Sequence, residues 1–394
     1  MKFPTVTLKP NKDQSLRRHH PWVFSGAIAT TERFLQPGET VEVKDNGGNT
    51  LGIGHWSEGS IAVRMVSFVP FDDEMSFWRE KLTRAWRLRE SLGFISNDAT
   101  NLFRLVNAEG DGMPGLIVDV YGTTAVIQVH SAGMLAKRQL FATLIAQVSG
   151  GRITSVFDKS ESKIFSHTGQ QIENGFLLGE GSDPVCRENG WLFEIDWALG
   201  QKTGFFIDQR ENRALLGQYA RGRKVLNTYC YTGGFSMYAL GNGAAYVHSV
   251  DSSQRAIDTL EKNIQLNKFD TAQHRSEKAD VQQFLQQHDL GYNLIVLDPP
   301  AFAKGLSARH SAVQAYRRLN ATALKKIESG GLLFTFSCSQ AVGRDLFEGA
   351  VLAAAIDTGR NVNILHRLHQ PADHPISIYH PEGEYLKGLV ISVD

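Results

Sequence analysis

Two strand ends in the second half of the chain carry side chains capable of covalent chemistry. Asp298 follows the apolar run 294–297, and Cys338 follows the apolar run 332–336. Because the carboxyl ends of parallel strands meet at one edge of a sheet, we expect the thiol and the carboxyl group to share a pocket. A cysteine thiolate can form a covalent intermediate with a substrate. Taken alone, however, a cysteine is more often a buried, inert hydrophobic residue.

A glycine turn upstream indicates a site for a nucleotide-like cofactor. The apolar run 225–229 leads into Thr232-Gly233-Gly234, and a helix-compatible segment follows. Glycines let the backbone approach a ligand closely, and the N–H groups that open a helix supply donors. The next apolar run ends at Asp251, about 20 residues past the turn, where an acid can bind a ribose. A Gly-Gly pair is also common in ordinary loops, and Asp251 could be a helix N-cap, so both alternatives stay open here.

Several ordered motifs together resemble a known family. They are Asn227 to Phe235, Asp251, Asp280, Asp298 to Phe302, and Phe336 to Ser339, with Gln201 to Arg210 and Asn107 to Gly112 as further family-like segments. They look like the motifs of class I S-adenosylmethionine-dependent methyltransferases. More narrowly, the chain resembles the bacterial large-subunit rRNA cytosine-C5 methyltransferases that carry an N-terminal PUA domain. The resemblance covers nearly the whole chain.

The resemblance implies S-adenosylmethionine as the cofactor. The backbone at 232–234 would cradle its methionine part, Asp251 would bind the ribose and Asp280 the adenine amino group. The expected cofactor-binding residues are Asn227, Thr232, Gly233, Gly234, Phe235, Asp251, Asp280, Asp298, Phe206 and Gln209. Two alternatives remain: Asp280 could cap a helix, and Phe206 and Gln209 could serve to join domains.

The resemblance also implies a mechanism. C5 of cytosine is a poor nucleophile, so a thiolate must first attack C6 while a carboxylic group protonates N3 or donates a hydrogen bond to it. Cys338 and Asp298 are the expected catalytic pair. Enzymes that methylate exocyclic amines commonly show Asn-Pro-Pro at the position of Asp298, which argues against amine methylation. Many RNA enzymes of this type carry a second cysteine that assists release, but Pro300 stands at that position, so release must use another base.

Two other functions stay open. One is methylation of another RNA base, such as guanine N7, on the same scaffold, and this reaction needs no thiol. The other is a non-catalytic RNA-binding factor for ribosome assembly. The presence of both Cys338 and Asp298 argues against each.

Length and composition indicate a globular protein rather than a membrane-spanning or secreted one. The chain has 394 residues, more than one ordinary core needs, and 42% of them are hydrophobic. It lacks an apolar stretch of the roughly 20 residues that a membrane span needs, and its first residues lack the apolar core of a signal peptide. We therefore expect a cytoplasmic protein. The three cysteines show no paired spacing, so we expect neither disulfides nor a metal site.

The segment order predicts an α/β protein with three parts. Residues 1–70 read as a β-rich, PUA-like RNA-binding domain, and 71–189 as a linker helix with a central α+β domain. Residues 190–394 alternate strands and helices regularly, which predicts a Rossmann-like methyltransferase domain with a mainly parallel sheet. The strands expected at 362–368 and 386–393 would form its antiparallel edge by analogy with the methyltransferase fold.

RNA contacts are expected from a local basic patch, because the net charge is zero. The predicted RNA-binding residues are Lys12, Arg17, Arg18 and Trp22. A charge run is usually a solvated face, but the resemblance to PUA domains favours RNA here. The basic segment 72–92 could face RNA or simply connect domains. The implied partner is large-subunit rRNA, unassembled or partly assembled, with no membrane involved and with a homodimer left open.

Overall fold

The computed structural model describes residues 3–160, 172–287, 291–303 and 305–394. Two compact units divide the chain. The first contains residues 1–186, 195–207 and 372–383, and the second contains 187–194, 208–371 and 384–394. The three predicted domain ranges stay predictions.

A six-stranded sheet occupies the N-terminal part of the first unit as far as it is described. Its strands are β1 (Thr5–Leu8), β2 (Trp22–Phe24), β3 (Ile28–Thr31), β4 (Thr40–Lys44), β5 (Thr50–Trp56) and β6 (Ile61–Ser67), in the order β2-β6-β5-β4-β1-β3. Side chains alternate between buried and partly buried along β1 and β4, which is the period of a half-covered strand. Val6, Leu8, Val41 and Val43 fill the resulting core. The short helix α1 (Gln14–Arg17) lies between β1 and β2 in the sequence.

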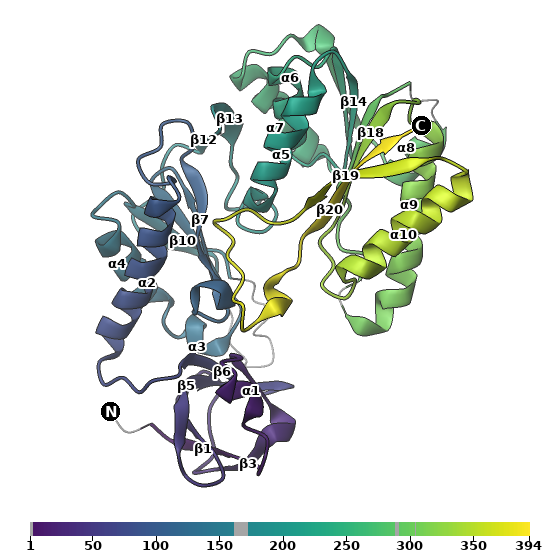
Figure 1. Cartoon of the computed structure of the whole chain (residues 1–394). Helices are drawn as coiled ribbons and strands as arrows, with labels where there is room; N and C mark the ends of the chain where they lie inside the picture. The colour runs from purple at the N-terminus through teal and green to yellow at the C-terminus, as the bar shows by residue number, and fades with distance from the viewer. Residues whose placement is uncertain (1–2, 161–171, 288–290, 304) are drawn as a thin grey trace. The chain divides into compact units, whose positions relative to one another are not determined.

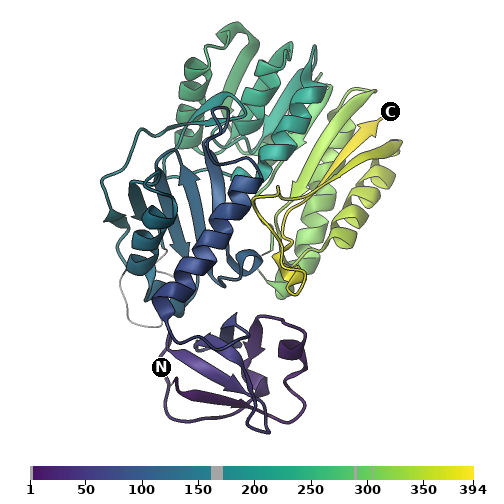
Figure 2. The ribbon, with the colours of Figure 1, turned by 60° about the vertical axis from the view of Figure 1, so that its left-hand side comes forward.

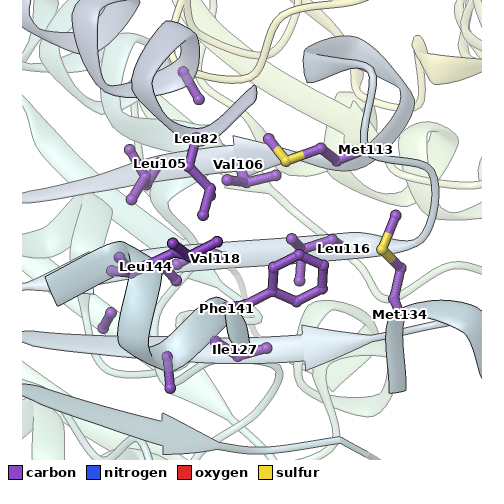
Figure 3. Packing of buried hydrophobic residues seen from close by; sticks show 14 of the residues in the cluster. Leu82, Leu105, Val106, Met113, Leu116, Val118, Ile127, Met134, Phe141 and Leu144 are labelled. Atoms are coloured by element: carbon purple, nitrogen blue, oxygen red, sulfur yellow. The ribbon is translucent and has the colours of Figure 1, made fainter. Parts of the chain in front are cut away.

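The first unit also contains a five-stranded sheet, and helices pack against it. The strands β7 (Leu102–Asn107), β8 (Leu116–Tyr121), β9 (Thr124–Val129), β10 (Ser155–Asp158) and β11 (Gly175–Leu178) lie in the order β11-β10-β9-β8-β7. The helices are α2 (Glu74–Ser91), α3 (Ala132–Leu135) and α4 (Arg138–Val148). Figure 2 shows α2 running along this sheet. Leu82 of α2 and Phe141 and Leu144 of α4 meet the sheet residues in the core of Figure 3. The predicted strands-helix-strands order is therefore present.

Asp111, in the loop after β7, and Asp119, in β8, serve the structure. Arg89, at the end of α2, is fully buried and binds both carboxylate oxygens of Asp111 at 2.6 and 2.8 Å. It also donates to the carbonyl oxygens of Arg104 and Asp373. Arg104 in turn holds Asp119 through two hydrogen bonds of 2.7 and 2.8 Å. Buried charges are tolerated when they are paired in this way.

The second unit contains a seven-stranded sheet among its described residues. The strands are β14 (Lys224–Thr228), β15 (Tyr246–Asp251), β16 (His274–Lys278), β17 (Leu294–Leu297), β18 (Gly331–Ser337), β19 (Val362–Leu368) and β20 (Lys387–Val393), in the order β16-β15-β14-β17-β18-β20-β19. The first five pair in parallel, whereas β20 pairs antiparallel with both β18 and β19. This confirms the predicted fold class, including its antiparallel edge. The short strands β12 (Val185–Glu188) and β13 (Trp191–Glu194) form a separate two-stranded sheet.

Helices cover both faces of this sheet (Figure 1). One face carries α5 (Arg210–Ala220), α6 (Gly234–Gly241) and α7 (Gln254–Leu266), and the other carries α8 (Val281–Gln287), α9 (Arg309–Lys326) and α10 (Arg344–Thr358). Because both faces are covered, all seven residues of β18 are buried. The strand therefore ends at the edge of the core, just before Cys338.

Candidate active site

The turn after β14 has an unusual backbone. Tyr229 and Tyr231 adopt positive φ angles of 53° and 47°, and Gly233 adopts 83°. Positive φ is uncommon for residues with a side chain, and such strain gathers at ligand-binding sites. The Cys230 N–H donates to the Val250 carbonyl oxygen across the two strand ends. The predicted glycine turn is therefore a constrained loop at the carboxyl edge of the sheet.

One side of the glycine turn is tightly filled. A Cβ atom at Gly233 would lie 2.7 Å from Leu260 Cγ, and one at Gly234 would lie 2.9 Å from Arg213 Cδ. Arg213 is itself fixed, because its guanidinium makes two hydrogen bonds of 2.8 Å to the buried carboxylate of Glu188. Glycine is thus required at position 233 by both conformation and space, and at position 234 by space.

Buried polar atoms near the turn lack partners. The Asn227 amide nitrogen donates to Ser236 Oγ at 2.8 Å, but Asn227 Oδ1 and Thr232 Oγ1 are buried without a hydrogen-bond partner among the described residues. Buried polar groups are normally satisfied, so unpaired atoms suggest a ligand or water. The Phe235 ring packs against Phe336 with centroids 5.6 Å apart. The residues present therefore fit a polar cofactor at this turn.

The two predicted cofactor acids differ in their surroundings. Asp251 accepts the Tyr231 N–H on one carboxylate oxygen and the Ser253 N–H on the other, both at 2.9 Å. It ties the turn to the end of β15 and keeps further lone pairs on both oxygens. Asp280 is exposed and accepts the Gln283 N–H at 2.9 Å, the bond of a helix N-cap. The ligand roles of both residues stay predictions.

Asp298 lies directly after β17 in a polar cluster. The Gln209 side-chain amide donates to Asp298 Oδ2 at 3.1 Å, and the Asn212 amide donates to Gln209 Oε1 at 2.6 Å. Burial, reinforced by the neighbouring Asp208, raises the pKa of Asp298 to about 7. Asp208 accepts the Tyr385 hydroxyl at 2.7 Å on one oxygen, and its other oxygen is buried without a partner among the described residues. A carboxyl group with this pKa can be neutral at physiological pH and can donate a hydrogen bond.

Cys338 lies beside this cluster. Leu297 pairs with Thr335 in the parallel register of β17 and β18, so Asp298 and Cys338 leave the sheet at the same edge. The structure thus brings the predicted catalytic pair together. Burial raises the pKa of the Cys338 thiol to about 11, and Asp298 and Asp208 add to this effect. The thiol is therefore protonated in this charge arrangement at neutral pH.

Lys387, for which no role was predicted, is buried in the same region. Its Nζ donates to the carbonyl oxygen of Ser339, the residue after Cys338, at 2.7 Å. Ser337 and Lys387 are direct partners in the antiparallel register of β18 and β20. The available signal was a single charged residue inside the mainly apolar run 386–393.

The other two cysteines are fully enclosed. Cys186 and Cys230 are 1% and 5% exposed, and burial raises the pKa of both thiols. Such surroundings are typical of an inert structural cysteine.

The predicted RNA-binding residues all lie in the first unit. Lys12 and Arg18 are exposed. Arg17 is paired with Asp13 and Asp45. Trp22 is half-buried, and its indole N–H donates to Glu109. Their RNA contacts stay predictions.

Phe206 belongs to the segment 195–207 of the first unit, so its predicted place in the cofactor site also stays a prediction. In the described part of the chain, every helix is too short or too polar to cross a membrane.

Family models match two parts of the chain. Residues 175–383 match the S-adenosylmethionine-dependent methyltransferase family, and residues 6–68 match the PUA-like domain family. The chain is 38% identical over 394 residues to the ribosomal RNA large subunit methyltransferase I of Alteromonas mediterranea, an alignment that covers 98% of both chains. It is 39% identical to the protein of the same name from Tolumonas auensis, again over 98% of each chain.

Solved structures share the fold. A SAM-dependent methyltransferase from Streptococcus mutans matches with a TM-score of 0.84 at 20% identity, over 99% of this chain and 100% of that one. A methyltransferase solved in complex with SAH matches with a TM-score of 0.85 at 20% identity and the same coverage. At this identity the likeness shows the fold alone.

Proposed function

The chain belongs to the family of ribosomal RNA large subunit methyltransferases, S-adenosylmethionine-dependent enzymes with a PUA-like domain, and we propose that it forms 5-methylcytosine in 23S rRNA through a covalent bond to Cys338. The observation that carries this proposal is the placement of Cys338 and Asp298. They leave neighbouring strands at the same edge of the sheet, and the glycine turn follows the next strand, β14, at that edge.

Cys338 is the proposed nucleophile. Its thiolate adds to C6 of the cytosine, which makes C5 an enamine carbon able to accept a methyl group. When bound, S-adenosylmethionine supplies that methyl group from a positively charged sulfonium. A reaction at an exocyclic amine or at guanine N7 would leave the thiol without a role.

Asp298 is the proposed partner of N3. In its neutral form it donates a hydrogen bond to this ring nitrogen, and electron density then moves away from C6 as the sulfur attacks. A pKa near 7 keeps a substantial neutral fraction at physiological pH. Gln209 orients the carboxyl group by donating to its other oxygen.

The residues of the turn would hold the cofactor. Asn227 Oδ1 and Thr232 Oγ1, which have no hydrogen-bond partner in the described part of the chain, offer acceptors for a polar ligand, as do the remaining lone pairs of Asp251. Asp280 is assigned to the adenine by resemblance, although its hydrogen bond to Gln283 also accounts for its presence.

The RNA substrate must present its target base outside the helical stack. A base inside a duplex cannot reach a thiol at a sheet edge, so single-stranded or partly folded rRNA should be the better substrate. We place the enzyme in the cytoplasm with unassembled or partly assembled large-subunit rRNA, and we assign docking to the PUA-like domain.

Trapping the covalent adduct tests this function. RNA that carries 5-fluorocytidine at the target cannot lose its C5 substituent as a proton, so wild-type protein should stay attached after methyl transfer. Cys338→Ala should abolish both the adduct and 5-methylcytosine, measured by mass spectrometry of rRNA, while cofactor affinity stays unchanged. Cys186→Ala is the matched control, because it removes a buried thiol of the first unit and should keep activity. Methylation at C5 by Cys338→Ala near the wild-type rate would refute the thiolate mechanism.

A further inference from the structure

Release of the product needs a base on a particular face of the cytosine ring. After methylation, C5 carries both a hydrogen and the new methyl group, and C6 is bonded to sulfur. The glycine turn follows β14 and Cys338 follows β18, with β17 between these two strands. A flat ring bound between the turn and the thiol would have the methyl donor on one face and the sulfur on the other, so the methyl group would be added opposite the sulfur. The C5 hydrogen is therefore left on the face of the sulfur. The base that removes it must lie on the thiol side of the site.

Lys387 is placed on that side. It is the register partner of Ser337, and its Nζ is 2.7 Å from the carbonyl oxygen of Ser339. These two residues flank Cys338 directly, so the amine is held next to the thiol by both the strand register and the hydrogen bond. The side chain is 3% exposed, which is rare for a lysine. We propose that Lys387 is the base that takes the C5 proton and releases Cys338 from the methylated ring.

The step balances without a further reactant. The C5–H bond breaks and its proton moves to the neutral Nζ of Lys387, while the electron pair of that bond forms the C5=C6 double bond. The C6–S bond breaks at the same time, and Cys338 leaves as a thiolate. The lysine loses its proton to solvent before the next cycle.

The surroundings of Lys387 suit a base at neutral pH. Burial lowers the pKa of Lys387 to about 8, while Cys338 and Glu384 act to raise it and Arg344 acts to lower it. Glu384 forms an ion pair with Arg344 at 2.8 Å. This pairing weakens the electrostatic effect of Glu384 on the pKa of Lys387. A sizeable fraction of the amine is therefore neutral between pH 7 and 8. An ordinary lysine, with a pKa near 10.4, would be almost entirely charged there.

Asp208 is the competing base. One of its carboxylate oxygens is buried and has no hydrogen-bond partner among the residues that the structure describes, and its charge acts on Cys338. Its other oxygen accepts the Tyr385 hydroxyl, and its charge also acts on Asp298. Asp208 therefore belongs with Asp298, the group assigned to N3. Lys387 instead donates a hydrogen bond to Ser339, the residue that follows Cys338.

The test uses ordinary, unfluorinated RNA, and it rests on the proposed function. Wild-type protein with S-adenosylmethionine and a 23S rRNA fragment should release its product and leave little adduct. Lys387→Arg keeps the positive charge and a donor for Ser339, but a guanidinium does not deprotonate in proteins. This variant should still add to C6 and transfer the methyl group once. It should then accumulate a denaturation-resistant protein–RNA adduct, with turnover reduced at least about 100-fold, the usual lower range for loss of a general base. Folded Lys387→Met protein should also accumulate the adduct and turn over slowly.

The controls separate this proposal from the proposed function. Cys338→Ala combined with Lys387→Arg should show no adduct. If wild-type protein fails to form an adduct even with 5-fluorocytidine, the thiolate mechanism itself is wrong. If wild-type protein does form that adduct but Lys387→Arg turns over normally, or loses activity without accumulating adduct, Lys387 is not the base. Accumulation of adduct by Asp208→Asn alone would assign the step to Asp208 instead.

Discussion

Asp298→Asn should stabilise the protein at neutral and alkaline pH while it removes methylation. The pKa of Asp298 is raised from 3.8 to about 7, with burial as the main cause. Between these two values the folded state binds the proton more tightly than the unfolded state, so stability is highest below about pH 4 and falls as the pH rises to about 7. One pKa unit corresponds to about 1.4 kcal/mol, so the shift corresponds to a loss of about 4 kcal/mol of unfolding free energy by pH 8. Asparagine is neutral throughout and can still accept the Gln209 hydrogen bond.

Calorimetric unfolding of the wild type and of Asp298→Asn between pH 4 and 8 measures this effect. The stability difference should be small at pH 4 and should grow in favour of the variant up to pH 8. Asp345→Asn, which removes an exposed carboxyl group at the start of α10, is the control and should show little such growth. If the difference between wild type and Asp298→Asn is the same at pH 4 and pH 8, burial does not destabilise the ionised carboxylate and its assignment as a neutral donor loses support.

Three further substitutions test the cofactor turn and the first unit. Asp251→Ala should weaken S-adenosylmethionine binding roughly 10- to 100-fold in calorimetry, because a hydrogen bond to a charged group contributes about 1.5–3 kcal/mol; an unchanged affinity would exclude the ribose role. Gly233→Ala should destabilise the protein more than Gly359→Ala in thermal unfolding, because both have positive φ but only Gly233 is crowded by side chains; equal losses would mean that the packing around the turn is loose. Arg89→Met should cost about 3–5 kcal/mol in denaturant unfolding, since it leaves Asp111 buried without its cation; a loss below about 1 kcal/mol would contradict that pairing.

The sequence predicts best what local pattern determines. The strand expected at 362–368 coincides with β19, the strand expected at 386–393 contains β20, and the apolar run 332–336 lies within β18. Apolar runs and turn residues encode such elements directly. Features that depend on distant partners were not foreseen. Arg89 lies on a basic helix that could have faced RNA, yet it binds Asp111 and a carbonyl oxygen 284 positions away. Nothing local to α2 encodes that contact.

The same limit applies to the active site. Cys338 and Asp298 could be placed at one sheet edge because parallel strands share an edge. Lys387 could not, because its position beside the thiol depends on the antiparallel register of β20 with β18. Asp280 shows the opposite case, since the sequence offered both a ligand role and a helix cap, and the structure contains the hydrogen bond of a cap.

The charges around Cys338 imply an order of events. Two carboxyl groups, Asp298 and Asp208, help to raise the pKa of the thiol to about 11, so little thiolate exists in the free site at neutral pH. A positive charge nearby favours the thiolate, and the sulfonium of S-adenosylmethionine carries one whereas the thioether of S-adenosylhomocysteine does not. The two ligands have nearly the same shape, so both should shield the Cys338 thiol from a reagent to the same extent. A difference between them therefore reports the effect of charge. Alkylation of Cys338 by iodoacetamide should therefore be faster with S-adenosylmethionine bound than with S-adenosylhomocysteine bound. Equal rates would mean that the thiol is activated by the RNA or by Lys387 rather than by the methyl donor. On this argument the nucleophile stays protonated until the methyl donor is in place, and RNA bound without the donor is not trapped in an unproductive adduct.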